Sequence, residues 1–191
     1  MNVEEAAQLL IRVVVIPLWI AAGLADWWCH RRTRIEATSG LPENVFHWAL
    51  LAQGGVAVVA VALLEINAAV LVLVLAVFLT HEVSTFVELR YTVPLRDVRP
   101  GEQMVHSFME LLPLVMLALL AVAAWEEVVA IVTGGLPDWS LRLKEQPWPA
   151  GYLLGAAAAI ALVNVVPMAE ETLRCMRRGS AARSPRPTGD R

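Results

Sequence analysis

Five long apolar stretches constrain the fold of this chain more than any other feature of its sequence. A helix needs about 20 mostly apolar residues to cross the hydrocarbon core of a bilayer. Five stretches meet that length, at about 6–28, 45–64, 68–87, 105–125 and 152–168. Apolar residues make up 58% of the chain and charged residues only 17%, which is too apolar for a solvated surface. We therefore expect an all-α integral membrane protein with about five transmembrane helices.

The helices are expected to form a single transmembrane domain, residues 1–176, followed by a tail. With their polar flanks, the five helices are predicted at about 6–30, 43–65, 67–90, 101–128 and 150–172. Glycines and prolines interrupt residues 129–149, which we expect to form a cap on the outer surface. Residues 177–191 are rich in arginine and lack apolar periodicity, so they are predicted to be a disordered basic tail in the cytoplasm.

Basic residues indicate how the helices are oriented, because loops rich in Lys and Arg stay in the cytoplasm. Arginines gather after the first, third and fifth stretches, whereas the opposite side holds only Arg12, Arg142 and Lys144. The N-terminus is therefore expected outside and the C-terminus inside. We expect the protein to lie in a bacterial cytoplasmic membrane, with the lipid bilayer as its partner, and nothing in the sequence indicates nucleic-acid binding.

The four histidines of the chain are its most informative polar residues. They are His30, His47, His81 and His106, one on each of the first four predicted helices and all near the cytoplasmic ends. A single histidine on a membrane helix is usually a hydrogen-bonded packing residue. Ionisable side chains next to hydrocarbon are costly, however, so four at one level indicate a functional site.

Carboxylates accompany these histidines at the spacing of one helical turn. Asp26 precedes His30 by four residues, and the same spacing separates Glu43 from His47 and Glu102 from His106, so each pair shares a helical face. Glu43 and Glu102 also fit as first-turn acids that complement a helix dipole. The order of residues is similar in 26–47 and 81–106, which predicts that the first four helices form a bundle of two similar hairpins. The predicted metal ligands are His30, His47, His81, His106, Glu43, Glu102, Asp26 and Glu82, with Glu36 and Glu88 as ligands or as acceptors that orient imidazoles.

Mixed imidazole and carboxylate ligands suit iron, manganese or zinc. Two ligand sets predict two metal ions, bridged by carboxylates. This pattern resembles the ferritin-like di-iron carboxylate bundles, in which two helices supply a Glu each and two supply Glu-x-x-His. The chain departs from it by its Glu-x-x-x-His spacing, its four histidines and its transmembrane helices. The resemblance implies iron as the metal and redox chemistry as the activity.

Three functions follow from these residues, and none assigns a catalytic residue. The first is a di-iron oxidase or oxygenase that acts on a lipid, a quinone or another membrane-soluble substrate with a redox partner. The second is an electron carrier in which the four histidines bind haem b. The third is a zinc hydrolase that attacks a lipid amide or ester with metal-activated water. A proton or ion path is a weaker fourth interpretation, because few ionisable residues continue through the outer half of the helices.

Overall fold

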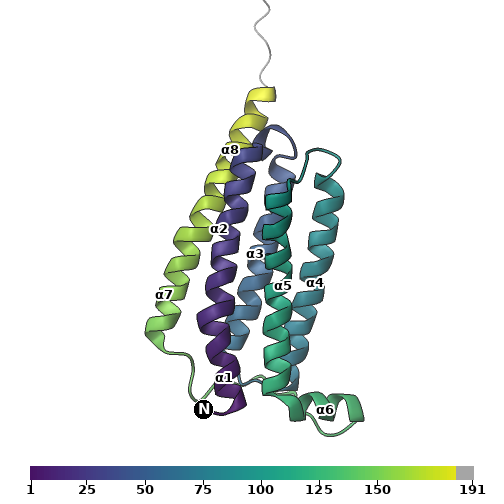
Figure 1. Ribbon diagram of the computed structural model, residues 1–191, viewed down its shortest axis with the longest axis vertical. Coiled ribbons are helices and arrows are strands. Elements are labelled where there is room, and N and C mark those ends of the chain that lie inside the picture. The colour runs from purple at the N-terminus through teal and green to yellow at the C-terminus, as the bar shows by residue number, and fades with distance from the viewer. Residues whose placement is uncertain (184–191) are drawn as a thin grey trace, which may run out of the picture.

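The computed structural model describes residues 1–183, and its regular structure is helical (Figure 1). Across these residues there is no β-strand, only an isolated bridge between Leu64 and Leu143. Five helices are long and apolar enough to cross a membrane: Val3–Thr33, Leu41–Leu63, Ala68–Thr92, Pro100–Ala123 and Ala150–Gly179. The prediction of an all-α protein with five helices long and apolar enough to span a membrane is confirmed for the described residues.

The first and last spans are each divided by a π-helical turn. The segments are α1 (Val3–Leu10), η1 (Ile11–Val15), α2 (Ile16–Thr33), η2 (Ile35–Ala37), α3 (Leu41–Leu63), α4 (Ala68–Thr92), α5 (Pro100–Ala123), α6 (Trp125–Thr133), α7 (Ala150–Ile160), η3 (Ala161–Val165) and α8 (Val166–Arg183). A proline explains both wide turns. The rings of Pro17 and Pro167 crowd the carbonyl groups four residues earlier, which belong to Val13 and Val163 inside η1 and η3.

Helices α2 to α5 pack side by side, and the fifth span lies against them. Helix α3 packs on α4, α2 on α5 and α4 on α5, while α8 contacts both α2 and α3. Helices α3 and α4 are joined by a tight turn, in which the Asn67 side chain accepts a hydrogen bond from the Val70 amide at 3.2 Å and caps α4. Figure 1 shows α7 leaning away from α1 and α2 towards one end of the protein. The similarity of two hairpins stays a prediction.

The segment that follows α5 closes one end of the protein. Helix α5 ends at Ala123 rather than near residue 128, and α6 lies across the end of the bundle (Figure 1). The chain then passes under the α3–α4 turn, where the Lys144 amide donates to the Leu63 carbonyl at 2.8 Å. The Lys144 ammonium is buried and donates to the Val61 carbonyl at 2.8 Å, and burial lowers its pKa.

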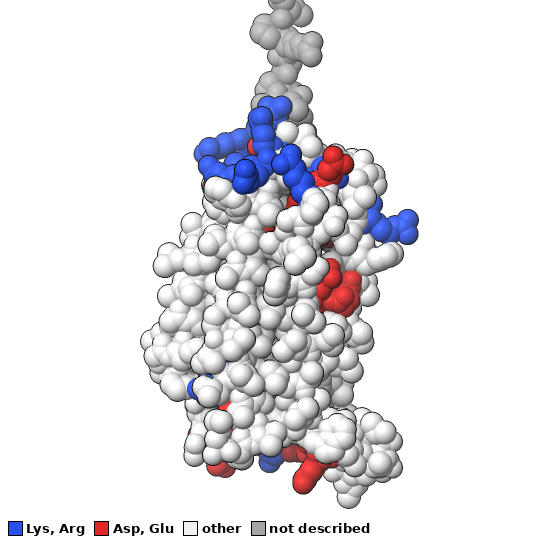
Figure 2. Space-filling model, viewed as in Figure 1, with Lys and Arg blue, Asp and Glu red and all other residues white. Residues whose placement is uncertain are grey.

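The apolar core and the charged residues occupy different parts of the protein. A hydrophobic core cluster includes Ile11, Val15, Val61, Leu120 and Trp148, so it lies near the end that carries the N-terminus. Lys and Arg gather at the other end, where α8 finishes, and the side between them is mostly uncharged in the view of Figure 2. Helix α8 continues to Arg183, seven residues into the tail predicted to be disordered. The rest of that tail lies outside the described residues.

Close helix packing predicts that two adjacent glycines of α3 differ in how well they tolerate substitution by alanine. A Cβ atom at Gly54 would lie 2.9 Å from the Trp19 ring, whereas one at Gly55 would meet nothing within 4 Å. Both substitutions gain the same helix propensity, so their difference isolates packing. We expect Gly54→Ala to be less stable than Gly55→Ala by about 1–3 kcal/mol. Thermal unfolding of the two variants in detergent measures this, and equal midpoints would contradict the packing at Gly54.

Candidate metal centre

One cluster of ionisable side chains, all buried except for the partly exposed His106, lies near the basic end of the bundle. Five helices contribute to it, so the cluster exists only once the helices are packed. Its members are Asp26 and His30 on α2, Glu43 and His47 on α3, Glu88 on α4, Glu102 and His106 on α5, and Glu171 on α8. His30, Glu102 and Glu171 are each only 1% exposed, and Glu43 is 0% exposed. Charged groups so deeply buried need partners of opposite charge.

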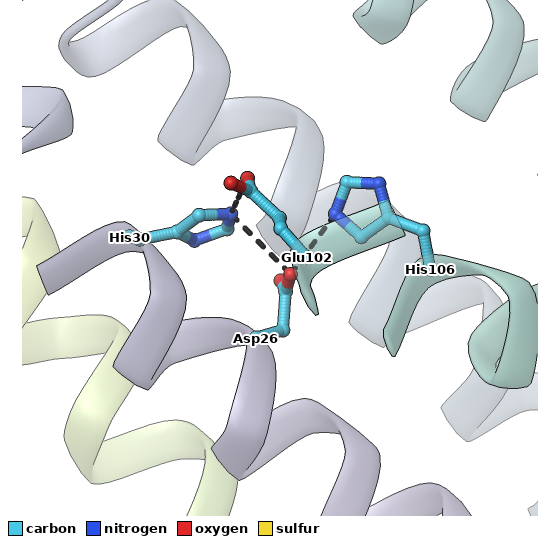
Figure 3. Close-up of side chains that lie close together, drawn as sticks. All are labelled: Asp26, His30, Glu102 and His106. Atoms are coloured by element: carbon cyan, nitrogen blue, oxygen red, sulfur yellow. Dashed lines mark hydrogen bonds and ion pairs between the residues drawn. The ribbon is translucent and has the colours of Figure 1, made fainter. Parts of the chain in front are cut away.

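The first part of the cluster joins α2 to α5 (Figure 3). The Nε2 atom of His30 lies 3.4 Å from Asp26 Oδ1 and 3.4 Å from Glu102 Oε1. The Nε2 atom of His106 lies 3.0 Å from the same Asp26 oxygen. One donor atom from each of these four residues falls within 4.8 Å of all the others. Four nitrogen and oxygen donors that converge in this way could hold one metal ion.

The second part of the cluster joins α3 to α2 and α4. Glu43 Oε1 lies 4.0 Å from Nε2 of His30 and 4.0 Å from Nε2 of His47, so this carboxylate stands between the two imidazoles. Glu88 Oε1 lies 3.6 Å from Nε2 of His47. His30, Glu43 and His47 also satisfy the 4.8 Å criterion as a group. The two groups lie side by side because they share His30. Since Glu43 lies between the two imidazoles, its carboxylate could bridge two ions.

Glu171 determines which nitrogen of each imidazole faces the cluster. Its two oxygens lie 3.2 Å from Nδ1 of His30 and 3.0 Å from Nδ1 of His47, and Asn44 donates to it at 2.9 Å. Because an ionised carboxylate only accepts hydrogen bonds, each imidazole donates from Nδ1, and in its neutral form it carries its lone pair on Nε2. A carboxylate behind a histidine has this role in metal sites.

The Nε2 atoms of His30 and His47 indicate that a partner belongs in front of them. Both are buried, and neither has a hydrogen-bond partner among the described residues. Glu88 Oε1 is likewise buried and has no hydrogen-bond partner among the described residues. Buried polar atoms are rarely left unpaired, and an unpaired one commonly marks an ion or a water site. The two rings stack at 4.4 Å between centroids with an 8° angle, so their Nε2 atoms lie side by side.

The cluster carries more negative than positive charge. Arg96, on the loop between α4 and α5, donates to both Glu43 and Glu102, and its side chain is only 3% exposed. Burial opposes the charge of this guanidinium, but hydrogen bonds to Glu102 and Glu43 outweigh burial and hold the Arg96 pKa above its usual value. A single guanidinium cannot neutralise the five buried carboxylates of the cluster. Protons or metal ions must supply the remaining positive charge.

Three residues that the sequence predicted as ligands lie outside the cluster. His81 is buried but packs edge-on against Trp19, with 6.4 Å between ring centroids. Glu82 is half-buried on the neighbouring position. Glu36 forms an ion pair with Arg174, nearer the end of the bundle. A ligand role for these three residues stays a prediction, whereas the structure brings the other seven predicted residues together.

Glu171 is the one member of the cluster that is absent from the predicted ligands. The adjacent Glu170 is partly exposed and pairs with Arg31 at 2.8 Å. Helical periodicity in the sequence could have distinguished Glu171 from Glu170. Asn164, Met168 and Glu171 follow a spacing of four and three residues, which places them on one face. All three line the same cavity.

A cavity of about 340 Å³ adjoins the cluster and extends between the helices. At one end it is lined by ionisable members of the cluster, among them His30, His47 and Glu88. Elsewhere its wall is mostly apolar, with Leu50 and Val58 of α3. An apolar cavity with a few converging polar groups at one end is typical of a binding site for a small molecule.

Comparisons with protein-family models, with curated protein sequences and with solved structures find no match to this chain. Its function must therefore be argued from the cluster and the cavity themselves.

The Arg96 ion pairs predict a large loss of stability when that arginine is removed. Arg96→Gln leaves Glu43 and Glu102 buried without their counter-charge, which costs about 3–5 kcal/mol. We expect a clearly lower unfolding temperature in metal-depleted protein, with partial recovery when a divalent metal is added. Arg99→Gln is the matched control, because Arg99 is exposed on the same loop. Equal unfolding temperatures for the two variants would contradict a stabilising role of the ion pairs.

Proposed function

We propose that this chain is a membrane-embedded di-metal redox protein, with iron as the metal, which acts as an oxidase or oxygenase on a membrane-soluble substrate. The observation that carries the proposal is the pair of buried Nε2 atoms of His30 and His47, which have no hydrogen-bond partner among the described residues. Carboxylate oxygens stand 3.4–4.0 Å in front of them, at a distance that leaves room for a cation between nitrogen and oxygen. Glu171 holds both imidazoles from behind, and Glu43 stands between them. Such an arrangement suits ligands that face cations.

The donor set divides into two sites with a shared carboxylate. Asp26, His30, Glu102 and His106 would hold one ion. His47 and Glu88 would hold the other, with Glu43 between the two sites. Carboxylates that bridge two ions are the hallmark of di-metal carboxylate bundles. Bound iron would supply the electron transfer and the activation of oxygen that no side chain of this chain can provide.

The residues of the chain then have separate tasks. Glu171 fixes the tautomer and the direction of the two imidazoles. Arg96 offsets part of the negative charge of Glu43 and Glu102, which limits the total charge of the loaded site. The apolar wall of the cavity excludes water and dissolves apolar substrates. An external redox partner would deliver electrons.

The geometry favours this proposal over haem and over a single zinc ion. A porphyrin held between two histidines needs space between their rings, but His30 and His47 are stacked at 4.4 Å. A catalytic zinc needs three protein ligands and an open position. The cluster offers more than twice that number of donors, in two groups. Mixed imidazole and carboxylate donors in this number suit two iron ions, although manganese can occupy similar sites.

We also propose that the cluster lies near the cytoplasmic face of a bacterial membrane. The basic residues around the cluster end of the bundle support this orientation (Figure 2), since Lys and Arg near helix ends stay in the cytoplasm. The N-terminus and α6 would then lie on the outer side. The bilayer would surround the uncharged middle of the bundle.

Metal analysis of purified protein tests the proposal directly. We expect about two irons per chain and no Soret band in the visible spectrum. His47→Ala and His106→Ala each remove one imidazole ligand and should lower the bound iron. Full iron occupancy in both variants would contradict the proposal. Haem absorption would favour the electron carrier instead, and one zinc per chain would favour the hydrolase.

The adjacent glutamates of α8 provide a sharper test with a matched control. Glu171→Gln keeps the shape of the side chain but removes the charge that holds both Nδ1–H groups. We expect about a 10–100-fold weaker affinity for the metal. Glu170→Gln, which alters an exposed ion pair, should leave the affinity unchanged. Titration of metal-depleted protein measures both, and an equal affinity for the two variants would exclude an orienting role of Glu171.

Cysteine accessibility tests the orientation. Glu145→Cys in the cap and Arg178→Cys at the end of α8 are both exposed positions, to be introduced with Cys29→Ser and Cys175→Ser. In intact cells, a membrane-impermeant maleimide should label position 145 at once. It should label position 178 only after the membrane is permeabilised. The reverse result would place the cluster at the outer face.

A further inference from the structure

We infer that the cavity beside the cluster binds the acyl chain of a membrane lipid, which reaches it sideways from the bilayer. The inference names a substrate class for the proposed function. Any reaction of the bound chain rests on that proposed function, whereas the binding of the chain does not. The occupant would be a single aliphatic chain. A segment of that chain would lie against the imidazoles and carboxylates of the cluster.

The cavity is elongated along α3. Its lining on this helix reaches from His47 to Val59, and a helical stretch of that length corresponds to about 18 Å. An extended hydrocarbon chain could lie along a cavity of this length, with the rest of the lipid outside it.

The mouth of the cavity opens on the side of the bundle. Gly55 and Val59 are four residues apart on α3, and both line the cavity although they are exposed, Val59 by 56%. Across from them, Ile160 and Val165 of the fifth span also line it. Helix α7 has no buried residue and leans away from α1 and α2 (Figure 1). Because lipid tails would surround this side of the protein, the mouth would face hydrocarbon rather than water.

Away from the cluster, most of the cavity wall is apolar, with Leu51, Val58 and Ile160 among its lining residues. The polar residues outside the cluster that line it are His81, Thr85, Glu110 and Asn164. The amide of Asn164 already donates from Nδ2 to the Ile20 carbonyl at 3.1 Å. An acyl chain can pack along the apolar part of this wall.

The glycines of α2 and α3 that line the cavity differ in the space available for a side chain. Trp19 fills the space beside Gly54, and Asn164 fills the space beside Gly23. Only open space lies within 4 Å of where a Cβ atom would stand at Gly55. A large side chain at position 55 would therefore narrow the mouth without a clash in the backbone. This makes Gly55 the point at which access of a chain can be controlled.

Photolabelling in lipid nanodiscs tests the inference. The probe is a stearate analogue with a diazirine near the end of its chain, and peptide mass spectrometry locates the label. In the unmodified protein we expect labelling inside the cavity, on peptides that contain residues 47–59 and 160–168. Gly55→Leu should reduce that labelling at least fivefold, and Val59→Trp at the same mouth should reduce it too. Gly151→Leu is the matched control, since position 151 is exposed, outside the cavity and also open.

The outcomes separate this inference from the proposed function. Cavity labelling that is equal in Gly55→Leu, Val59→Trp and Gly151→Leu would overturn the inference. So would labelling of the cavity by an isoprenoid quinone probe but not by the stearate probe. Metal content is measured on the same samples. Blocked labelling with no metal in the unmodified protein would overturn only the di-metal proposal, whereas bound iron without cavity labelling would overturn only the acyl-chain inference.

Discussion

The structure depends above all on how it neutralises a group of carboxylates buried inside an apolar bundle. Five helices each bring at least one member to the cluster, and among the described residues only Arg96 supplies it with a permanent positive charge. In a medium of low dielectric this imbalance would push the helices apart. The loop that carries Arg96 inward, and the imidazoles held by Glu171, are responses to that one constraint. The same imbalance is what makes the cluster attractive to cations.

Burying the cluster costs free energy, which explains why one end of the bundle is a close-packed apolar core and the other is held by polar interactions. Near the N-terminal end, Ile11, Val61 and Leu120 belong to a close-packed core, which is reinforced where the cap passes under the α3–α4 turn. Near the other end the helices are held by hydrogen bonds and ion pairs. Neither end alone accounts for the fold. The core fixes the positions of the helices, and those positions bring the donor atoms of the cluster within reach of one another.

The sequence predicted the spans well because length and apolarity are local properties. It also predicted most of the cluster, since acids one turn from a histidine share its helical face whatever the tertiary structure. It could not predict how far along the axis of the bundle each side chain would lie. His81 lies seven residues before Glu88, about 10 Å along α4, and so it reaches Trp19 rather than the cluster. Nor could it show which of two adjacent acids faces inward, because the side that α8 presents to α2 and α3 is decided by packing.

The fifth span contributes residues to both the cluster and the cavity. Asn164 and Met168 form part of the cavity wall, and Glu171, on the same face, holds the two imidazoles. The cavity-facing part of the span contains η3 and Pro167, where the helix lacks regular hydrogen bonds and bends most easily. Met168 lies beyond this turn, so a chain that pressed on Met168 would be felt at Glu171 through the first turn of α8. Occupation of the cavity and the direction of the imidazoles would then be coupled by a single helix, without any loop having to move.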